Sequence, residues 1–67
     1  MSMKHIITAT NGVLIETMRR ALEKGGHYNF VQGQLAEAEL RGRGVKVWLI
    51  DWHQSTDSIL SLVGRGA

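Results

Sequence analysis

The segment from Val45 to Trp52 constrains the fold more than any other part of the sequence. In an extended chain, successive side chains point to opposite faces. One face would carry Val45, Val47 and Leu49, and the other would carry Lys46, Trp48 and Ile50. Both faces are then largely apolar, which is typical of a parallel strand that is covered on both sides in an α/β protein. We therefore expect a buried β-strand over residues 45–52.

Glycines mark the boundaries of the other expected elements, because the sequence contains 8 glycines and no proline. Short runs of β-branched and aromatic residues predict strands over residues 4–10 and 27–32. Apolar residues at helical spacing predict helices over residues 13–24, 34–41 and 55–63. This order predicts an α/β fold of the βαβαβα type, in which right-handed crossovers build a three-stranded parallel sheet in the order 2-1-3.

Polar residues before two of these helices are suited to cap them. Asn11 is expected to accept from the first free backbone N–H groups of the helix over 13–24. Ser55 or Thr56 is expected to do the same for the helix over 55–63.

A chain of 67 residues forms one domain, 1–67, and such a domain buries only about 60% of the surface that its unfolded chain exposes. The sequence has no cysteine, so disulfides cannot supplement this small core. In the order 2-1-3 the third strand lies at a sheet edge, and an apolar edge favours pairing with another chain. We therefore expect a homodimer or a domain stabilised by another protein, with Trp48 and Trp52 in the interface.

The net charge of +2 does not by itself indicate a nucleic-acid-binding protein. An α+β winged-helix fold is nevertheless an alternative, with residues 34–41 and 55–63 as helices of a DNA-binding unit. In that alternative, phosphates and bases would be contacted by Arg41, Arg43 and Lys46 and by Trp48 and Trp52.

Asp51 ends the expected third strand, at the edge where open parallel sheets bind their ligands. It either begins a turn or takes part in function. Thr10, Asn11 and Gly12 either form a plain strand-to-helix turn or bind an anion through backbone N–H groups. A ligand-binding or enzyme subunit could use Asp51, His53 and this loop at an interface.

No apolar run is long enough to span a membrane, and the N-terminus lacks the apolar segment of a signal peptide. We expect a cytoplasmic protein that does not contact a membrane. His5, His27 and His53 lack the three- or four-residue spacing that lets a helix present two metal ligands. We therefore expect neither a metal nor a cofactor.

Three segments, His5–Thr10, Met18–Tyr28 and Val45–Asp51, together resemble the first half of a response-regulator receiver domain. The resemblance implies a flavodoxin-like fold with Asp51 at the phosphoacceptor position. Receivers hold Mg²⁺ with a pair of acids after the first strand, where this chain has Ala9, Thr10 and Asn11. The later receiver strands, with their switch hydroxyl and lysine, have no counterpart in the pattern. The resemblance thus implies a non-catalytic, receiver-like regulatory module of signal transduction that acts by protein–protein interaction or dimerisation.

Overall fold

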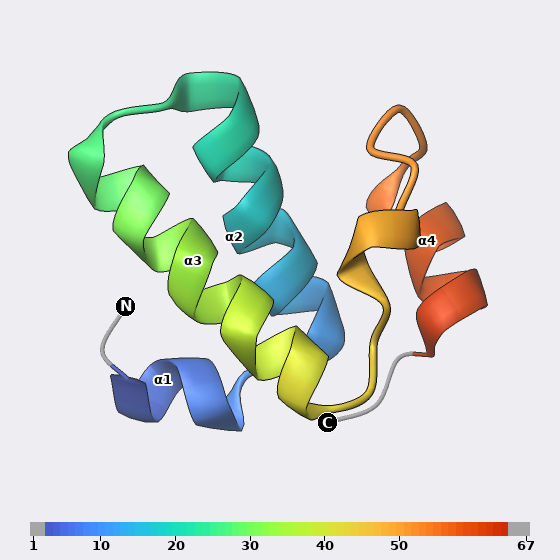
Figure 1. The fold of residues 1–67 in the computed structure, drawn as a ribbon. Coiled ribbons are helices and arrows are strands. Elements are labelled where there is room, and N and C mark those ends of the chain that lie inside the picture. The colour runs from blue at the N-terminus through green and yellow to red at the C-terminus, as the bar shows by residue number, and fades with distance from the viewer. Residues whose placement is uncertain (1–2, 65–67) are drawn as a thin grey trace.

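The computed structural model describes residues 3–64, which form a bundle of helices (Figure 1). In chain order, the elements are α1 (Met3–Thr8), α2 (Asn11–Lys24), α3 (His27–Gly42), the short 3₁₀ helix η1 (Val47–Leu49) and α4 (Thr56–Val63). The helices α2 and α3 run antiparallel beside each other, and η1 and α4 lie on the other side of α2 from α1 (Figure 1). Residues 3–64 contain no strand, so the predicted three-stranded parallel α/β sheet and its flavodoxin-like topology are wrong.

The predicted strand over 45–52 is instead a tight turn at Lys46, where the N–H of Val47 donates to the carbonyl of Val45 at 3.1 Å, followed by η1. The N–H groups of Leu49 and Ile50 donate back to the carbonyls of Lys46 and Val47, at 3.0 and 3.2 Å. These bonds close local turns and take the place of bonds to a neighbouring strand. Val47 is buried, whereas Trp48 is 65% exposed. Although the segment has apolar residues on two sides, Val47 packs into the core and Trp48 lies at the surface.

The predicted first strand is helix α1, although β-branched residues such as Ile6 and Ile7 favour strands. Ile6 is completely buried, whereas Ile7 is 54% exposed. The Thr8 hydroxyl donates to the carbonyl of Lys4 at 2.9 Å, a bond that β-branched threonine makes within a helix. Packing of one apolar side chain into the core therefore outweighs the local strand preference.

The predicted second strand is the first part of α3, because the chain does not break at Gly33. The N–H of Phe30 donates to the carbonyl of Gly26 at 2.9 Å, and the Asn29 amide donates to the carbonyl of Gly25 at 2.9 Å. Gly33 lies inside α3, where a Cβ atom would be only 2.7 Å from the Cβ of Ala21 on α2. Glycine at this position allows α2 and α3 to approach closely, and it does not mark a turn.

The predicted helices are confirmed with changed boundaries. The helix expected over 34–41 is the second half of α3, and the helix over 13–24 begins two residues earlier than expected. Thr10, not Asn11, caps α2 by accepting from the N–H of Val13 at 3.3 Å. Ser55 caps α4 as predicted, because its hydroxyl oxygen accepts from the N–H of Ser58 at 3.2 Å.

The core lies where all four α-helices and the segment around η1 meet. Each of these elements contributes at least one buried apolar side chain, and the set comprises Ile6, Leu14, Ile15, Ala36, Leu40, Val45, Val47, Ile59 and Leu60. None of the helices described in residues 3–64 has the length and apolar character needed to cross a membrane.

Candidate functional site

Arg19 of α2 forms hydrogen bonds to the loop between η1 and α4. Its guanidinium donates to the carbonyls of Trp52 and Gln54, at 3.0 and 2.9 Å. The same guanidinium lies 5.8 Å from the centre of the Trp52 ring, within the range of a cation–π contact. Beside it, the Thr56 hydroxyl donates to the carboxylate of Glu16. These contacts hold η1 and the start of α4 in place on α2.

Arg43, a candidate phosphate contact in the sequence, forms a second internal link. Its guanidinium donates to the carboxylate of Glu39 at 2.8 Å, to the side-chain oxygen of Asn11 at 3.0 Å and to the carbonyl of Ile7 at 3.2 Å. The Asn11 amide donates in turn to the carbonyl of Gly64 at 3.0 Å. Arg43 and Asn11, a member of the candidate anion loop, therefore link the ends of α1, α3 and α4 to the start of α2.

The other two members of that loop, Thr10 and Gly12, border a shallow hollow between α2 and α4. The Thr10 hydroxyl accepts from the α2 backbone as a cap, and the carboxylate of Glu16 and the guanidinium of Arg20 line the same hollow. An anion would therefore face one acid as well as one base there, which gives the hollow no net preference for negative charge.

Trp48 stands at the edge of a groove of about 340 Å³ that runs between α2 and α3, the Trp48 groove. Its apolar walls include Leu22 of α2 and Phe30 of α3, which are 65% and 56% exposed. Trp52, the other predicted interface residue, is half-buried at the same groove. The structure therefore brings both tryptophans to one surface, together with side chains that were not predicted to belong to it.

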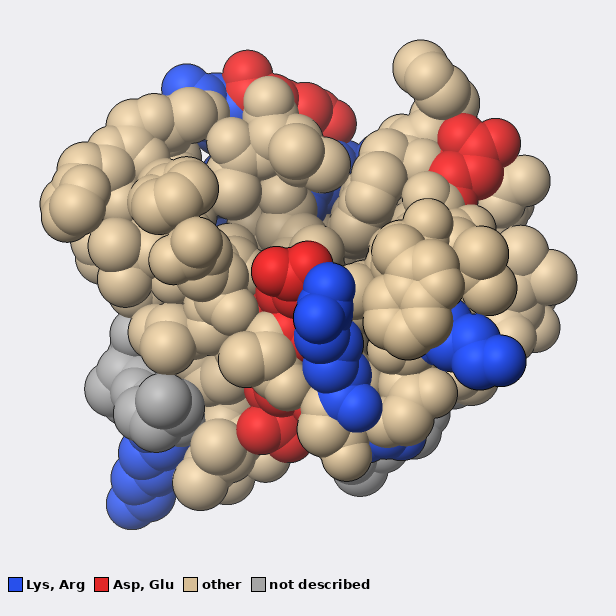
Figure 2. Space-filling view, in the orientation of Figure 1, with Lys and Arg blue, Asp and Glu red and all other residues tan. Residues whose placement is uncertain are grey.

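The charged groups beside the Trp48 groove balance one another. The guanidinium of Arg41 lies 5.5 Å from the centre of the Trp48 ring and 3.5 Å from the carboxylate of Glu37. Figure 2 shows basic and acidic side chains next to each other on this face, with no continuous basic patch over α3 and η1. Arg41 is therefore paired with Trp48 and Glu37, and it does not form part of a broad phosphate-binding surface on this face.

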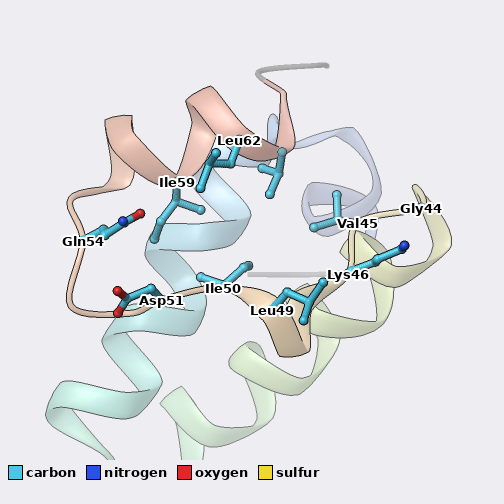
Figure 3. Close-up of a pocket in the computed structure, with 10 residues that line it drawn as sticks. Gly44, Val45, Lys46, Leu49, Ile50, Asp51, Gln54, Ile59 and Leu62 are labelled. Atoms are coloured by element: carbon cyan, nitrogen blue, oxygen red, sulfur yellow. The ribbon is translucent and has the colours of Figure 1, made fainter.

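A second apolar groove of about 350 Å³, the α4 groove, lies between α4 and the segment that leads into and out of η1. Ile59 and Leu62 line it from α4, and Leu49 and Ile50 line it from the opposite side (Figure 3). Two charged residues, Lys46 and Asp51, border this groove.

Asp51 lies on the loop after η1, and its neighbours form a turn. Its carboxylate accepts from the backbone N–H of His53 at 3.0 Å, the bond of an Asx turn. The Ser55 hydroxyl donates to the hydroxyl of Ser58 at 3.1 Å while it caps α4. These side chains shape the loop, and across residues 3–64 no group of three or more acids and histidines is placed to hold a metal ion.

Sequence patterns alone did not identify Leu22, Phe30, Leu49 and Leu62 as surface residues. The pattern placed Leu22 on the apolar face of its helix, Phe30 in a strand, and Leu49 in the strand that was expected to be buried. Leu62 comes two residues after the buried Leu60, which places the two side chains on opposite sides of α4, and this was the available signal.

Searches against protein-family models, curated proteins and solved structures find no match to this chain.

Proposed function

We propose that the protein is a non-catalytic interaction module that binds an amphipathic helix of another protein in the Trp48 groove. One observation carries the proposal. Leu22, Phe30 and Trp48 are each more than half exposed, yet they gather around one groove. A cluster of exposed large apolar side chains marks an interaction site more often than an isolated one does.

The shape of the groove favours a helix as the partner. Its walls are the antiparallel helices α2 and α3, which approach closely because Gly33 lies against Ala21. A third helix can pack along such a pair, with apolar side chains at helical spacing entering the groove. Because Glu37 and Arg41 already neutralise each other, the contacting face of that helix is expected to be apolar rather than charged.

The groove is also held in position before binding. The contacts from Arg19 to Trp52 and to the carbonyl of Gln54 fix the loop that follows η1. A rigid site loses little conformational entropy when it binds. Trp48 and its neighbours therefore have the features of a preformed hot spot, in which an exposed tryptophan supplies much of the binding energy.

A displayed library of amphipathic helical peptides, selected against the full chain, tests the proposal. We expect peptides whose affinity falls about 30-fold or more with Trp48→Ala, the loss that corresponds to about 2 kcal/mol at a hot spot. Leu22→Ser is expected to weaken them as well. Ile7→Ser is the matched control, because Ile7 is also about half exposed but lies on α1, outside the groove.

Binding that is as sensitive to Ile7→Ser as to Trp48→Ala would show that the peptides use another surface, and it would contradict the proposal. Failure to select any helical peptide would also contradict it. Circular dichroism of each variant shows whether the fold is intact, which is expected because all three side chains are largely exposed.

A further inference from the structure

Asn11 is followed by Gly12, and asparagine before glycine is the pair at which protein chains deamidate most readily. The backbone nitrogen of Gly12 loses its proton and attacks the side-chain Cγ of Asn11, ammonia leaves, and a five-membered succinimide ring forms. Water then opens the ring at either carbonyl, which yields aspartate or isoaspartate. Glycine favours the attack because it has no Cβ to crowd the nitrogen and leaves the backbone flexible.

The structure places this reactive pair where parts of all four α-helices meet. Asn11 is the first residue of α2 and is only 6% exposed. Arg43, which follows α3, donates to the side-chain oxygen of Asn11 at 3.0 Å, and it also donates to the carbonyl of Ile7 in α1. The Asn11 amide donates to the carbonyl of Gly64, which follows α4, at 3.0 Å. We call these four residues the Asn11 junction.

Three features of the folded chain oppose closure of the ring. The ring requires the Gly12 nitrogen and the Asn11 Cβ to be nearly eclipsed about the Cα–C bond, and the helical backbone at residue 11 holds them apart. Hydrogen bonds at both polar atoms of the Asn11 side chain fix its orientation, and burial keeps water from the site. An opened or unfolded chain loses all three protections.

We propose that Asn11 is a modification site that deamidates only when the Asn11 junction opens, so that the covalent state of residue 11 records the time the chain has spent open. The change also acts on the fold. A carboxylate at position 11 still accepts from Arg43, but it cannot donate to the carbonyl of Gly64. Isoaspartate, in addition, lengthens the backbone at the start of α2. The modified chain therefore loses its link to the end of α4 and opens more readily.

This inference goes beyond the proposed function. Neither Asn11 nor Gly12 lines the Trp48 groove, and the modification requires no partner. Deamidation and peptide binding are therefore measured separately, and either proposal can fail without the other.

Incubation of the full chain at neutral pH, followed by peptide mapping with mass spectrometry, tests the inference. We expect Asn11 to deamidate at least about 100-fold more slowly in sodium chloride than in guanidinium chloride of the same concentration, because only the open fraction reacts. Asn29 is the internal control, since Phe30 after it hinders the attack in both solutions. Gly12→Ala should lose most of the reaction even when unfolded, and it retains the fold because its Cβ would lie 3.4 Å from the Leu60 side chain.

A variant that weakens the Asn11 junction tests which contacts protect the site. Arg43→Met is expected to speed deamidation in sodium chloride by about tenfold or more, through loss of a charge-assisted hydrogen bond, and to leave the rate in guanidinium chloride unchanged. Arg20→Met is the matched control and should change neither rate, because Arg20 is an exposed arginine of α2 outside the junction. Circular dichroism shows whether each variant is folded, and the comparison of the two solutions for the original chain does not depend on either variant.

Amide hydrogen exchange of Asn11→Asp measures the effect of the product on the fold. The N–H of Gly64 donates to the carbonyl of Leu60 at 2.8 Å, and we expect it to exchange about fivefold faster than in the original chain, because the end of α4 has lost a hydrogen bond. The N–H of Ser58, which donates to Ser55 at the start of α4, is the control and should exchange at its original rate.

Equal rates of deamidation in the two solutions would overturn the inference, because the fold would then give no protection. A slower reaction of folded Arg43→Met would also overturn it, since Arg43 would then promote the attack by stabilising the negative charge that develops on the side-chain oxygen of Asn11. Unchanged exchange at Gly64 in Asn11→Asp would refute the effect of the modification on α4.

Discussion

Replacing Gly33 by alanine tests the closest approach of the two long helices. Alanine in a helix interior is about 1 kcal/mol more favourable than glycine. Here, however, the new Cβ would lie 2.7 Å from the Cβ of Ala21, which is short and rigid, so the helices would have to move apart. Such overpacking costs about 1 to 3 kcal/mol. We therefore expect Gly33→Ala to lower the free energy of unfolding by about 1 kcal/mol, the middle of the resulting range.

The same substitution is expected to have the opposite effect when Ala21 is glycine. The next nearest atom to the new Cβ is the Cα of Met18, at 4.0 Å, which is an ordinary contact. Only the gain in helix propensity then remains, so Gly33→Ala should stabilise the Ala21→Gly variant by about 1 kcal/mol. The sign of the effect, and not only its size, depends on one methyl group.

Urea denaturation followed by circular dichroism, at one protein concentration for all variants, measures these free energies. In a thermal experiment, 1 kcal/mol corresponds to a shift of about 4–8 °C for a domain of this size. Gly42→Ala is the control, because no atom lies within 4 Å of its Cβ position, and it should not destabilise the protein. If Gly33→Ala stabilised both backgrounds equally, the close packing described for α2 and α3 would be refuted.

Three further predictions concern the core and the links that hold η1 and α4. Leu40→Ala, at a completely buried position, should lower the free energy of unfolding by about 2 to 5 kcal/mol in urea denaturation, whereas Leu22→Ala should change it by less than about 0.5 kcal/mol. Arg19→Lys should cost about 1 to 3 kcal/mol in the same assay despite its retained charge, because lysine cannot reproduce the forked contacts to the loop carbonyls; an unchanged midpoint would contradict that role. Ser55→Ala should cost about 1 kcal/mol through loss of the α4 cap, seen as faster amide exchange at the start of α4 than in α2, and equal exchange would count against it.

The candidate site was only partly accessible from the sequence. Trp48 and Trp52 were predicted to form an interface, and the structure places both at one groove. The reason given for that prediction, an exposed strand edge, is wrong, because residues 3–64 contain no sheet. Arg43 was a candidate for binding phosphate, but the sequence does not show that its side chain reaches the carbonyl of Ile7, 36 residues away.

The helices α2 and α4 were determined locally, since their apolar periodicity and, for α4, the Ser55 cap act within one or two turns. The segment 45–52 was decided by tertiary structure. Apolar residues on both faces of a segment predict burial of both faces only if other parts of the protein cover them. Whether they are covered depends on residues that are distant in the sequence. Ile6 and Phe30 lie in helices, so no strand was available to pair with this segment. Its backbone then closed local turns, Val47 entered the core, and Trp48 remained at the surface.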